Sequence, residues 1–443
     1  MKNILMITPF FAPYSHAAVY RAHRFAKYLP RFGWKPYVLT VDKSFLYFID
    51  MALLDDLPKE VEIIRARHLD LTFSGFKTLL EKPVADSRAI KGPTSADLTA
   101  KLQENEKSNF VINSIDQFRE KVLFLPDRYI TWYPFALEKA KKILNSEHIN
   151  AIYSTAYPLT PHLIAMKLKS QFKIPWVADF REQGVEDYRG GYMASKFRYK
   201  ISSMLEKKIM GEADLILTIG EELADFFSSK YQDVVDNKVR HIRTGTDIEI
   251  LQRSKPKEKS GKFTIMFTGE FLPAYSRKLF EFLKIIFERK LFERSKIEVL
   301  IVGSVKRNAF LNKEMELSGI SDVVKVVDFI SLNDYFGVLL SADATFLPNV
   351  IKHTLTIKLT DYLFAKKPII IFDSTSEVRE ILEKSGLGFF IPSKNEDGIR
   401  ALLNLLRGNY KFDLNNEYIS QFTAFNQTKG LSDILAGLTE KNG

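Results

Sequence analysis

Residues 343–372, DATFLPNVIKHTLTIKLTDYLFAKKPIIIF, form the stretch that decides the fold of this 443-residue chain. The pattern predicts a short strand from Ala344 to Leu347, a polar loop, a helix that starts near Thr354 and a second strand from Pro368. Both strands are short and mostly apolar, as is typical of strands buried on both faces of a sheet. The stretch therefore predicts one unit of an α/β fold.

Two polar residues on the first turns of the predicted helix are candidates for binding a ligand. A helix N-terminus offers free N–H groups and a partial positive charge, which favour a phosphate. Lys358 would add a positive charge there, and Asp361 would accept hydrogen bonds from a ribose. The alternative is an ordinary α/β helix on which both side chains are solvated.

Composition narrows the class of protein. Lys and Arg number 64 and Asp and Glu 54, so the net charge is +10, which suits phosphate-bearing substrates, an anionic membrane surface or nucleic acid. The chain has no cysteine, which excludes disulfides and thiolate metal sites. It has no apolar window long enough to span a membrane. We expect a cytoplasmic protein, with peripheral contact to the inner face of the plasma membrane as a further option, and no nucleic-acid partner.

The N-terminal residues predict a doubly wound opening. Lys2 to Thr8 is an apolar strand, a loop carrying His16 follows, and a helix with apolar residues at helical spacing ends at Gly33. Trp34 to Val41 is the second strand. In such sheets ligands bind outside the carboxyl ends of the strands, which makes His16 a candidate. From about residue 70 to 125 the pattern weakens, and residues 81–119 have few large apolar groups, which predicts a mobile insertion.

A cluster of charges follows another predicted strand at its carboxyl end. The segment 174–182, IPWVADFRE, places Asp179, Arg181 and Glu182 there. One interpretation is contact with a substrate, and the other is a structural ion pair between Asp179 and Arg181. The basic helix 194–210 that comes next would either lie on an anionic membrane or pack on the sheet.

A charged linker, residues 253–262, separates a second α/β region. Its first strands, 263–268 and 298–302, end in Gly269 and Gly303, and glycine allows a ligand to approach the backbone closely. We predict an N-terminal domain over 1–250, a C-terminal domain over 251–412, and final helices over 413–443.

Several of these segments resemble glycosyltransferases of the GT-B fold, family-4 type. The resemblance rests on Lys358-Leu-Thr-Asp361-Tyr-Leu before Pro368, on 174–182, on Thr244-Gly-Thr-Asp247 and on the opening strand and loop. It implies two Rossmann-like domains facing a cleft, with the last helix crossing back to the first domain. It further implies sugar transfer from a UDP- or GDP-type donor to a glycan or lipid-linked hydroxyl acceptor, with retained configuration and without a metal.

The resemblance also assigns roles to residues. Gly269, Gly303, Lys358 and either Arg277 or Lys278 would hold the donor phosphates, and Asp361 its ribose; the catalytic candidates that would meet sugar or acceptor are His16, Asp179 and His353. Three positions depart from the family pattern, namely Thr244, Glu270 and His353. The alternatives are therefore an inactive binding subunit of the same fold, or a sugar-nucleotide epimerase.

Overall fold

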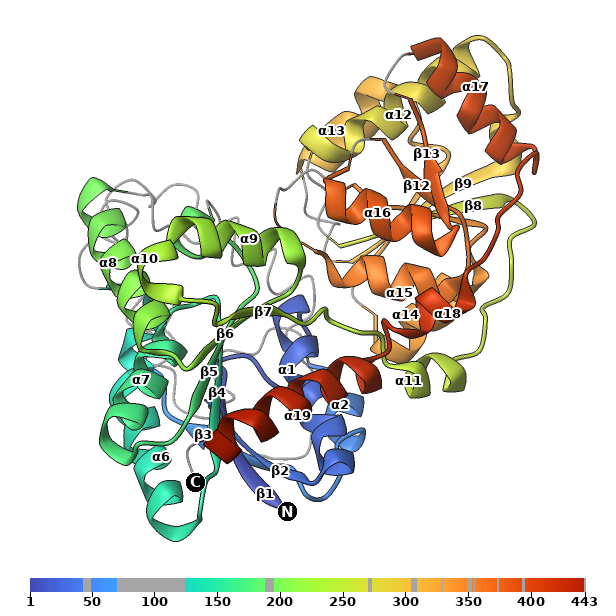
Figure 1. The fold of residues 1–443 in the computed structure, drawn as a ribbon. Helices are drawn as coiled ribbons and strands as arrows, with labels where there is room; N and C mark the ends of the chain where they lie inside the picture. Colours follow the sequence, from blue (N-terminus) through green and yellow to red (C-terminus); the bar gives the residue numbers. More distant parts are fainter. Residues whose placement is uncertain are drawn as a thin grey trace, which may run out of the picture. The chain divides into compact units, whose positions relative to one another are not determined.

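The computed structural model describes residues 1–42, 49–69, 124–187, 195–269, 273–303, 309–328, 330–348, 353, 355–372, 374–392 and 395–441. The chain forms two compact units, Met1–Ile242 with Thr428–Gly443, and Arg243–Gln427 (Figure 1). We predicted a first boundary at residue 250 and a separate segment from 413, whereas the units divide at 242 and again at 427. The predicted insertion at about 70–125 lies almost wholly outside the described residues.

A seven-stranded parallel sheet forms the centre of the N-terminal unit, in the order β3-β2-β1-β4-β5-β6-β7. Its strands are β1 (Lys2–Ile7), β2 (Trp34–Val41), β3 (Glu62–Ala66), β4 (Ala151–Ala156), β5 (Trp176–Phe180), β6 (Leu215–Thr218) and β7 (Val239–His241). The central strand β1 pairs with β2 on one side and β4 on the other, and Ile4 to Ile7 are inaccessible to solvent. Burial on both faces explains the unbroken apolar run of this strand.

Helices cover both faces of this sheet (Figure 1). They are α1 (Ala17–Tyr28), η1 (Leu29–Phe32), α2 (Ala52–Asp55), η3 (Arg128–Trp132), α6 (Tyr133–Ser146), α7 (Thr160–Phe172), η4 (Gly184–Glu186), α8 (Lys196–Glu212), α9 (Glu221–Lys230), α10 (Gln232–Val235) and most of α19 (Ala424–Lys441). The dark red helix α19 lies beside the blue first strands, where Lys2 Nζ donates to Thr439 Oγ1 at 2.9 Å (Figure 1). None of the described helices has the length and apolarity needed to cross a membrane.

The C-terminal unit holds a six-stranded parallel sheet in the order β10-β9-β8-β11-β12-β13. Its strands are β8 (Phe263–Thr268), β9 (Ile297–Val302), β10 (Val324–Val327), β11 (Ala344–Phe346), β12 (Ile369–Ile371) and β13 (Gly388–Phe390). Its helices are α11 (Ile248–Arg253), α12 (Pro273–Glu288), η7 (Arg294–Lys296), α13 (Ala309–Ser318), α14 (Leu332–Ser341), α15 (Ile357–Ala365), α16 (Ser376–Ser385), α17 (Asn395–Leu406) and α18 (Asn416–Ser420).

Strand order in both sheets follows from the alternation of strands and helices along the chain. Every pairing is parallel, and each sheet changes direction beside its first strand, β1 or β8. This is the doubly wound arrangement, so the predicted fold class of two Rossmann-like domains is confirmed. The predicted helix near Thr354 begins at Ile357, three residues later, because Thr356 is still extended.

The buried residue His162 predicts that the N-terminal unit becomes less stable at acid pH. Ser154 Oγ accepts a hydrogen bond from Trp176 Nε1 and shares another with His162 Nδ1, both at 2.7 Å. Burial lowers the pKa of His162 from 6.5 to about 3. Between these values the unfolded chain binds a proton that the folded chain does not, so stability is complete above about pH 6.5 and falls as pH falls toward 3.

We expect the free energy of unfolding to fall by up to about 1.4 kcal/mol per pH unit over this range through His162 alone. Urea unfolding followed by tryptophan fluorescence will report it, because Trp34, Trp132 and Trp176 are all in this unit and buried. The variant His162→Gln should show a flatter dependence on pH. The same slope in both proteins would contradict the prediction.

Candidate functional site

Two glycine turns lie side by side at the carboxyl end of the C-terminal sheet. Gly269 follows β8 with φ +91°, and Gly303 follows β9 with φ +140°, backbone angles that side chains other than glycine rarely adopt. The Gly269 N–H donates to the Val302 carbonyl at 2.8 Å, which holds the turns together. A Cβ atom on Gly303 would lie 3.2 Å from Gly269 Cα, so the second turn has no room for a side chain.

Lys358 reaches the first of these turns from the first turn of helix α15. A Cβ atom on Gly269 would lie 2.9 Å from Lys358 Nζ, so only glycine allows this approach without displacing the lysine. The ammonium group also lies 4.9 Å from the centre of the Phe267 ring. The structure therefore brings together three predicted phosphate-binding residues, Gly269, Gly303 and Lys358, from three separate parts of the sequence.

Buried hydrogen bonds fix helix α15 against the strand that carries Gly269. Tyr362 OH lies 3.0 Å from Thr268 Oγ1 at the end of β8, and Thr246 Oγ1 donates to Asp361 Oδ1 at 2.8 Å. Asp361 is only 3% exposed. The structure thus gives Asp361 a role in positioning α15, and its contact with the donor ribose stays a prediction.

The N-terminus of α15 has the properties of an anion-binding site. Its first turn contains no acidic residue, and its N-cap residue Thr356 makes no capping hydrogen bond through its side chain. Thr356 Oγ1 is buried and, among the described residues, has no hydrogen-bond partner. Free N–H groups, a helix dipole, this hydroxyl and the Lys358 ammonium together favour a phosphate group. Sequence analysis missed Thr356, since an isolated threonine before a helix carries no distinguishing pattern.

The other predicted donor-site residues lie in different surroundings. Arg277, on α12, forms a bidentate ion pair with Glu314 of α13, at 2.9 Å and 2.5 Å. This pair occupies the guanidinium group that we expected to bind phosphate. Lys278 is its half-buried neighbour. His353 has a left-handed backbone, φ +58°, and is half-buried. Glu270, another position that departs from the family pattern, lies outside the described residues.

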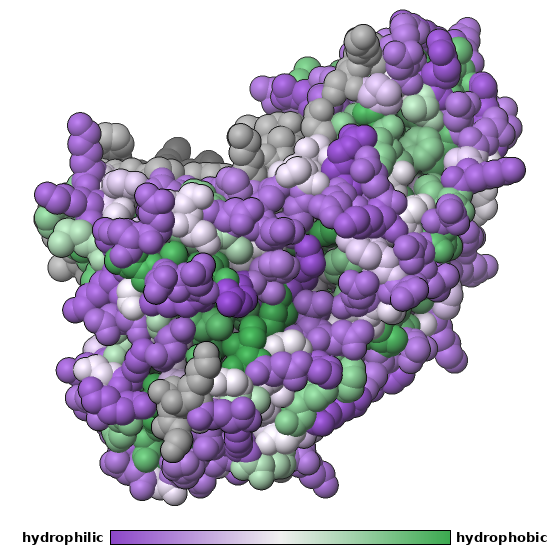
Figure 2. Space-filling model, viewed as in Figure 1, coloured by the Kyte–Doolittle hydropathy of each residue, from purple (hydrophilic) through white to green (hydrophobic). Residues whose placement is uncertain are grey.

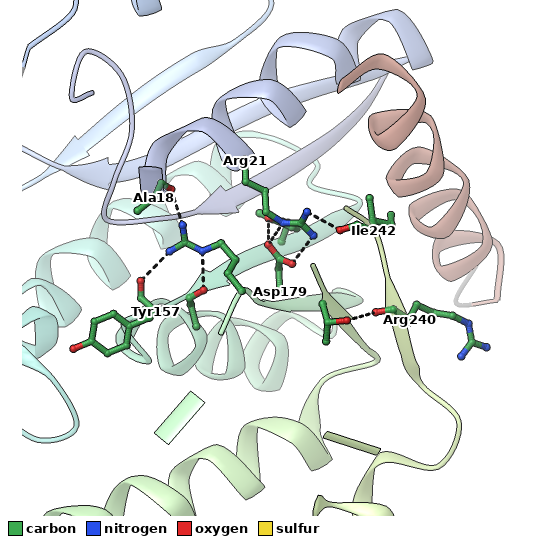
Figure 3. Close-up of polar contacts among 10 residues, drawn as sticks. Ala18, Arg21, Tyr157, Asp179, Arg240 and Ile242 are labelled. Carbon is green, nitrogen blue, oxygen red and sulfur yellow. Dashed lines mark hydrogen bonds and ion pairs between the residues drawn. The ribbon is translucent and has the colours of Figure 1, made fainter. Parts of the chain in front are cut away.

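In the N-terminal unit, Asp179, which we predicted to meet sugar or acceptor, lies in a buried hydrogen-bond network. Its carboxylate accepts two hydrogen bonds from Arg21, both at 2.8 Å, and a third from Tyr153 OH at 2.5 Å (Figure 3). Asp179 is 0% and Arg21 1% exposed, so neither can touch a substrate. Arg21 Nη1 also donates to the Ile242 carbonyl at 2.7 Å. Asp179 therefore anchors helix α1 to strand β5.

Arg181 is not the partner of Asp179, contrary to the ion pair that we considered. It donates to the backbone carbonyls of Ala156, Ala18 and Tyr157, at 2.8, 2.8 and 3.0 Å (Figure 3). These carbonyls belong to the loop after β4 and to the start of α1. Arg181 thus ties together two segments at the carboxyl end of the sheet.

His16 lies at this end, as predicted, and its side chain is exposed. It is the N-cap of α1, where Nδ1 accepts from the Ala18 N–H at 3.2 Å. Its ring stacks on Tyr14 with centres 5.6 Å apart and planes 4° apart, and Phe10 lies 6.2 Å away. Partial desolvation of the imidazole by the surrounding residues and the charge of Arg181 lower the pKa of His16, which favours its neutral form. The described residues contain no group of three His, Cys, Asp or Glu side chains placed to hold a metal.

The structure thus has two doubly wound domains, and the second carries the cluster of Gly269, Gly303 and Lys358 at the N-terminus of α15. Residues 249–421, nearly the whole C-terminal unit, match the family model described as "Glycosyl transferases group 1". This match confirms the resemblance to GT-B glycosyltransferases for this part of the chain. Comparison of the sequence with curated proteins gives no match.

Solved structures extend the likeness over the whole chain. Sucrose-phosphate synthase from Thermosynechococcus elongatus aligns with TM-score 0.58 and 14% identity, over 100% of this chain and 98% of its own. Anabaena Alr3699/HepE in complex with UDP aligns with TM-score 0.54 and 11% identity, over 100% and 98%. UDP-GlcNAc 2-epimerase from Methanocaldococcus jannaschii aligns with TM-score 0.52 and 11% identity, over 98% and 99%. At such identities the likeness establishes the fold.

Proposed function

We propose that this protein transfers a sugar from a nucleotide-sugar donor to a hydroxyl acceptor. The observation that carries the proposal is the cluster of Gly269, Gly303 and Lys358 at the N-terminus of α15, within the part of the chain that matches the group 1 glycosyltransferase family. In this proposal the cluster binds the donor diphosphate. The close backbone approach at the two glycines leaves space for it, and Lys358 neutralises part of its charge.

The chemistry that this arrangement supports is stabilisation of the leaving group. As the bond between sugar and diphosphate breaks, negative charge grows on the diphosphate oxygens. A lysine and helix N–H groups that are already in place stabilise this charge without reorganisation. We propose that transfer proceeds in this way without a metal and with retained configuration at the sugar.

UDP is the first nucleotide to test, because the Anabaena protein of the same fold was solved with UDP and with UDP-glucose. GDP-type donors are the second choice. On the acceptor side we propose His16 with the stacked ring of Tyr14, since sugars pack well against aromatic faces and a neutral imidazole accepts a proton from a hydroxyl group. The acceptor would be a glycan or a lipid-linked saccharide.

Thermal unfolding in the presence of UDP, GDP, ADP, CMP and dTDP, each alone and as sugar conjugates, tests the proposal. A ligand that binds only the folded state stabilises it by about 2.7 kcal/mol at a hundredfold excess over its dissociation constant. We expect one nucleotide to raise the midpoint. Folded protein that responds to none of them would argue for an inactive binding subunit. Conversion of the donor sugar without any acceptor would instead indicate an epimerase.

A further inference from the structure

Among the described residues, the buried contacts of helix α8 with the N-terminal unit lie on one face of the helix. Glu206 on this face is inaccessible to solvent and binds the Val185 N–H at 2.7 Å, Lys230 Nζ at 2.9 Å and Tyr231 OH at 2.5 Å. Arg198, one end of the same face, donates to the Pro126 carbonyl at 3.0 Å. Because these buried contacts fix the rotation of the helix, the opposite face points permanently outward.

The outward face combines large apolar side chains with lysines. Phe197 is 59% and Met204 64% exposed, and at 3.6 residues per turn their spacing of seven positions places both side chains almost in line. Four exposed lysines flank this line, Lys196, Lys200, Lys207 and Lys208. In the space-filling view, the edge of the unit that α8 occupies carries hydrophobic residues among hydrophilic ones (Figure 2).

The charges of this face are poorly matched within the protein. Lys207 pairs with Asp233 of α10 at 2.5 Å, but no described residue forms an ion pair with Lys196, Lys200 or Lys208. The helix has only two acidic residues, the buried Glu206 and Glu212 in its last turn. A partner for this face must therefore accept apolar side chains and supply negative charge.

We infer that this outward face of α8 docks on an anionic membrane surface. Phe197 and Met204 enter the boundary between headgroups and acyl chains, and the lysines contact lipid phosphates. A lipid surface meets both requirements over the whole length of the helix. Sequence analysis treated membrane contact and packing on the sheet as alternatives, whereas the structure shows a packed face and an exposed face on one helix. The inference does not rest on the proposed transferase activity.

Sedimentation of the full chain with vesicles tests this inference. One vesicle set is phosphatidylcholine alone, and the other is phosphatidylcholine and phosphatidylglycerol in equal parts. We expect binding to the second set and little to the first. Each lysine near an anionic surface contributes about fivefold to binding, so the triple variant Lys196→Gln, Lys200→Gln, Lys208→Gln should bind about a hundredfold more weakly.

A matched control tests whether membrane binding depends on this face of α8 or on the net charge of the protein. The triple variant Lys59→Gln, Lys139→Gln, Lys142→Gln removes the same charge from exposed positions elsewhere in the unit and should bind as the unchanged protein does. Lys358→Ala should also bind normally, which separates membrane docking from donor binding. Phe197→Ser with Met204→Ser should weaken binding about tenfold or more. Equal binding by the α8 variants and their controls, or no binding by the unchanged protein, would overturn the inference.

Discussion

Asp179→Ala should destabilise the N-terminal unit by about 3–5 kcal/mol, because it leaves the charge of Arg21 buried without its carboxylate. Arg21 is only 1% exposed, so water cannot replace the two hydrogen bonds that its guanidinium group loses. Tyr153 OH loses its acceptor in the same variant. Urea unfolding followed by tryptophan fluorescence measures the effect in the unit that contains all three tryptophans.

Three further variants test whether the buried charge is the cause. Arg21→Met combined with Asp179→Leu removes both charges and should be less destabilising than Asp179→Ala. Tyr153→Phe removes one hydrogen bond and should cost about 1 kcal/mol. Glu138→Ala breaks the exposed pair with Lys142 and should leave stability unchanged. If Asp179→Ala unfolded at the same urea concentration as the unchanged protein, the anchoring role would be wrong.

Lys358→Ala should raise the dissociation constant of UDP about ten- to a hundredfold, because it removes a charge-assisted contact with the diphosphate. The prediction depends on the proposed donor site, where Nζ lies beside the Gly269 turn. Isothermal titration calorimetry with UDP gives the constant directly. If UDP raises no thermal midpoint, the nucleotide that does so replaces it in this measurement.

The controls for Lys358 test whether UDP binding depends on this lysine or on the total positive charge of the C-terminal unit. Lys313→Ala removes an exposed lysine from α13 of the same unit and should leave UDP binding unchanged. Lys358→Arg keeps the positive charge but changes its shape, so it should bind UDP more tightly than Lys358→Ala and less tightly than the unchanged protein. Both Lys358 variants should unfold at the same temperature as the unchanged protein when no nucleotide is present. Normal UDP binding by Lys358→Ala would exclude this lysine from the donor site.

The candidate site in the C-terminal unit was largely predictable from local sequence. Gly269 and Gly303 each end a predicted strand, and Lys358 falls on the first turn of a predicted helix, so the doubly wound topology already places them at one edge of the sheet. Arg277, in contrast, was assigned to the phosphates by the resemblance, as an alternative to Lys278. Its guanidinium group instead pairs with Glu314, 37 residues away, and no local pattern indicates that partner.

The sequence by itself determined the elements of this protein and their order in two parallel sheets, because strand and helix formation depend on apolar periodicity and turn residues that lie close together in the chain. Only the tertiary structure decided which polar groups satisfy one another. Asp179 bonds to Arg21, 158 residues earlier, and Asp361 bonds to Thr246, 115 residues earlier. A buried carboxylate must find a donor wherever packing provides one, and that choice depends on the whole folded chain. The same holds for α8, whose sequence is amphipathic and basic, but whose fixed and exposed faces were decided by the contacts of Glu206.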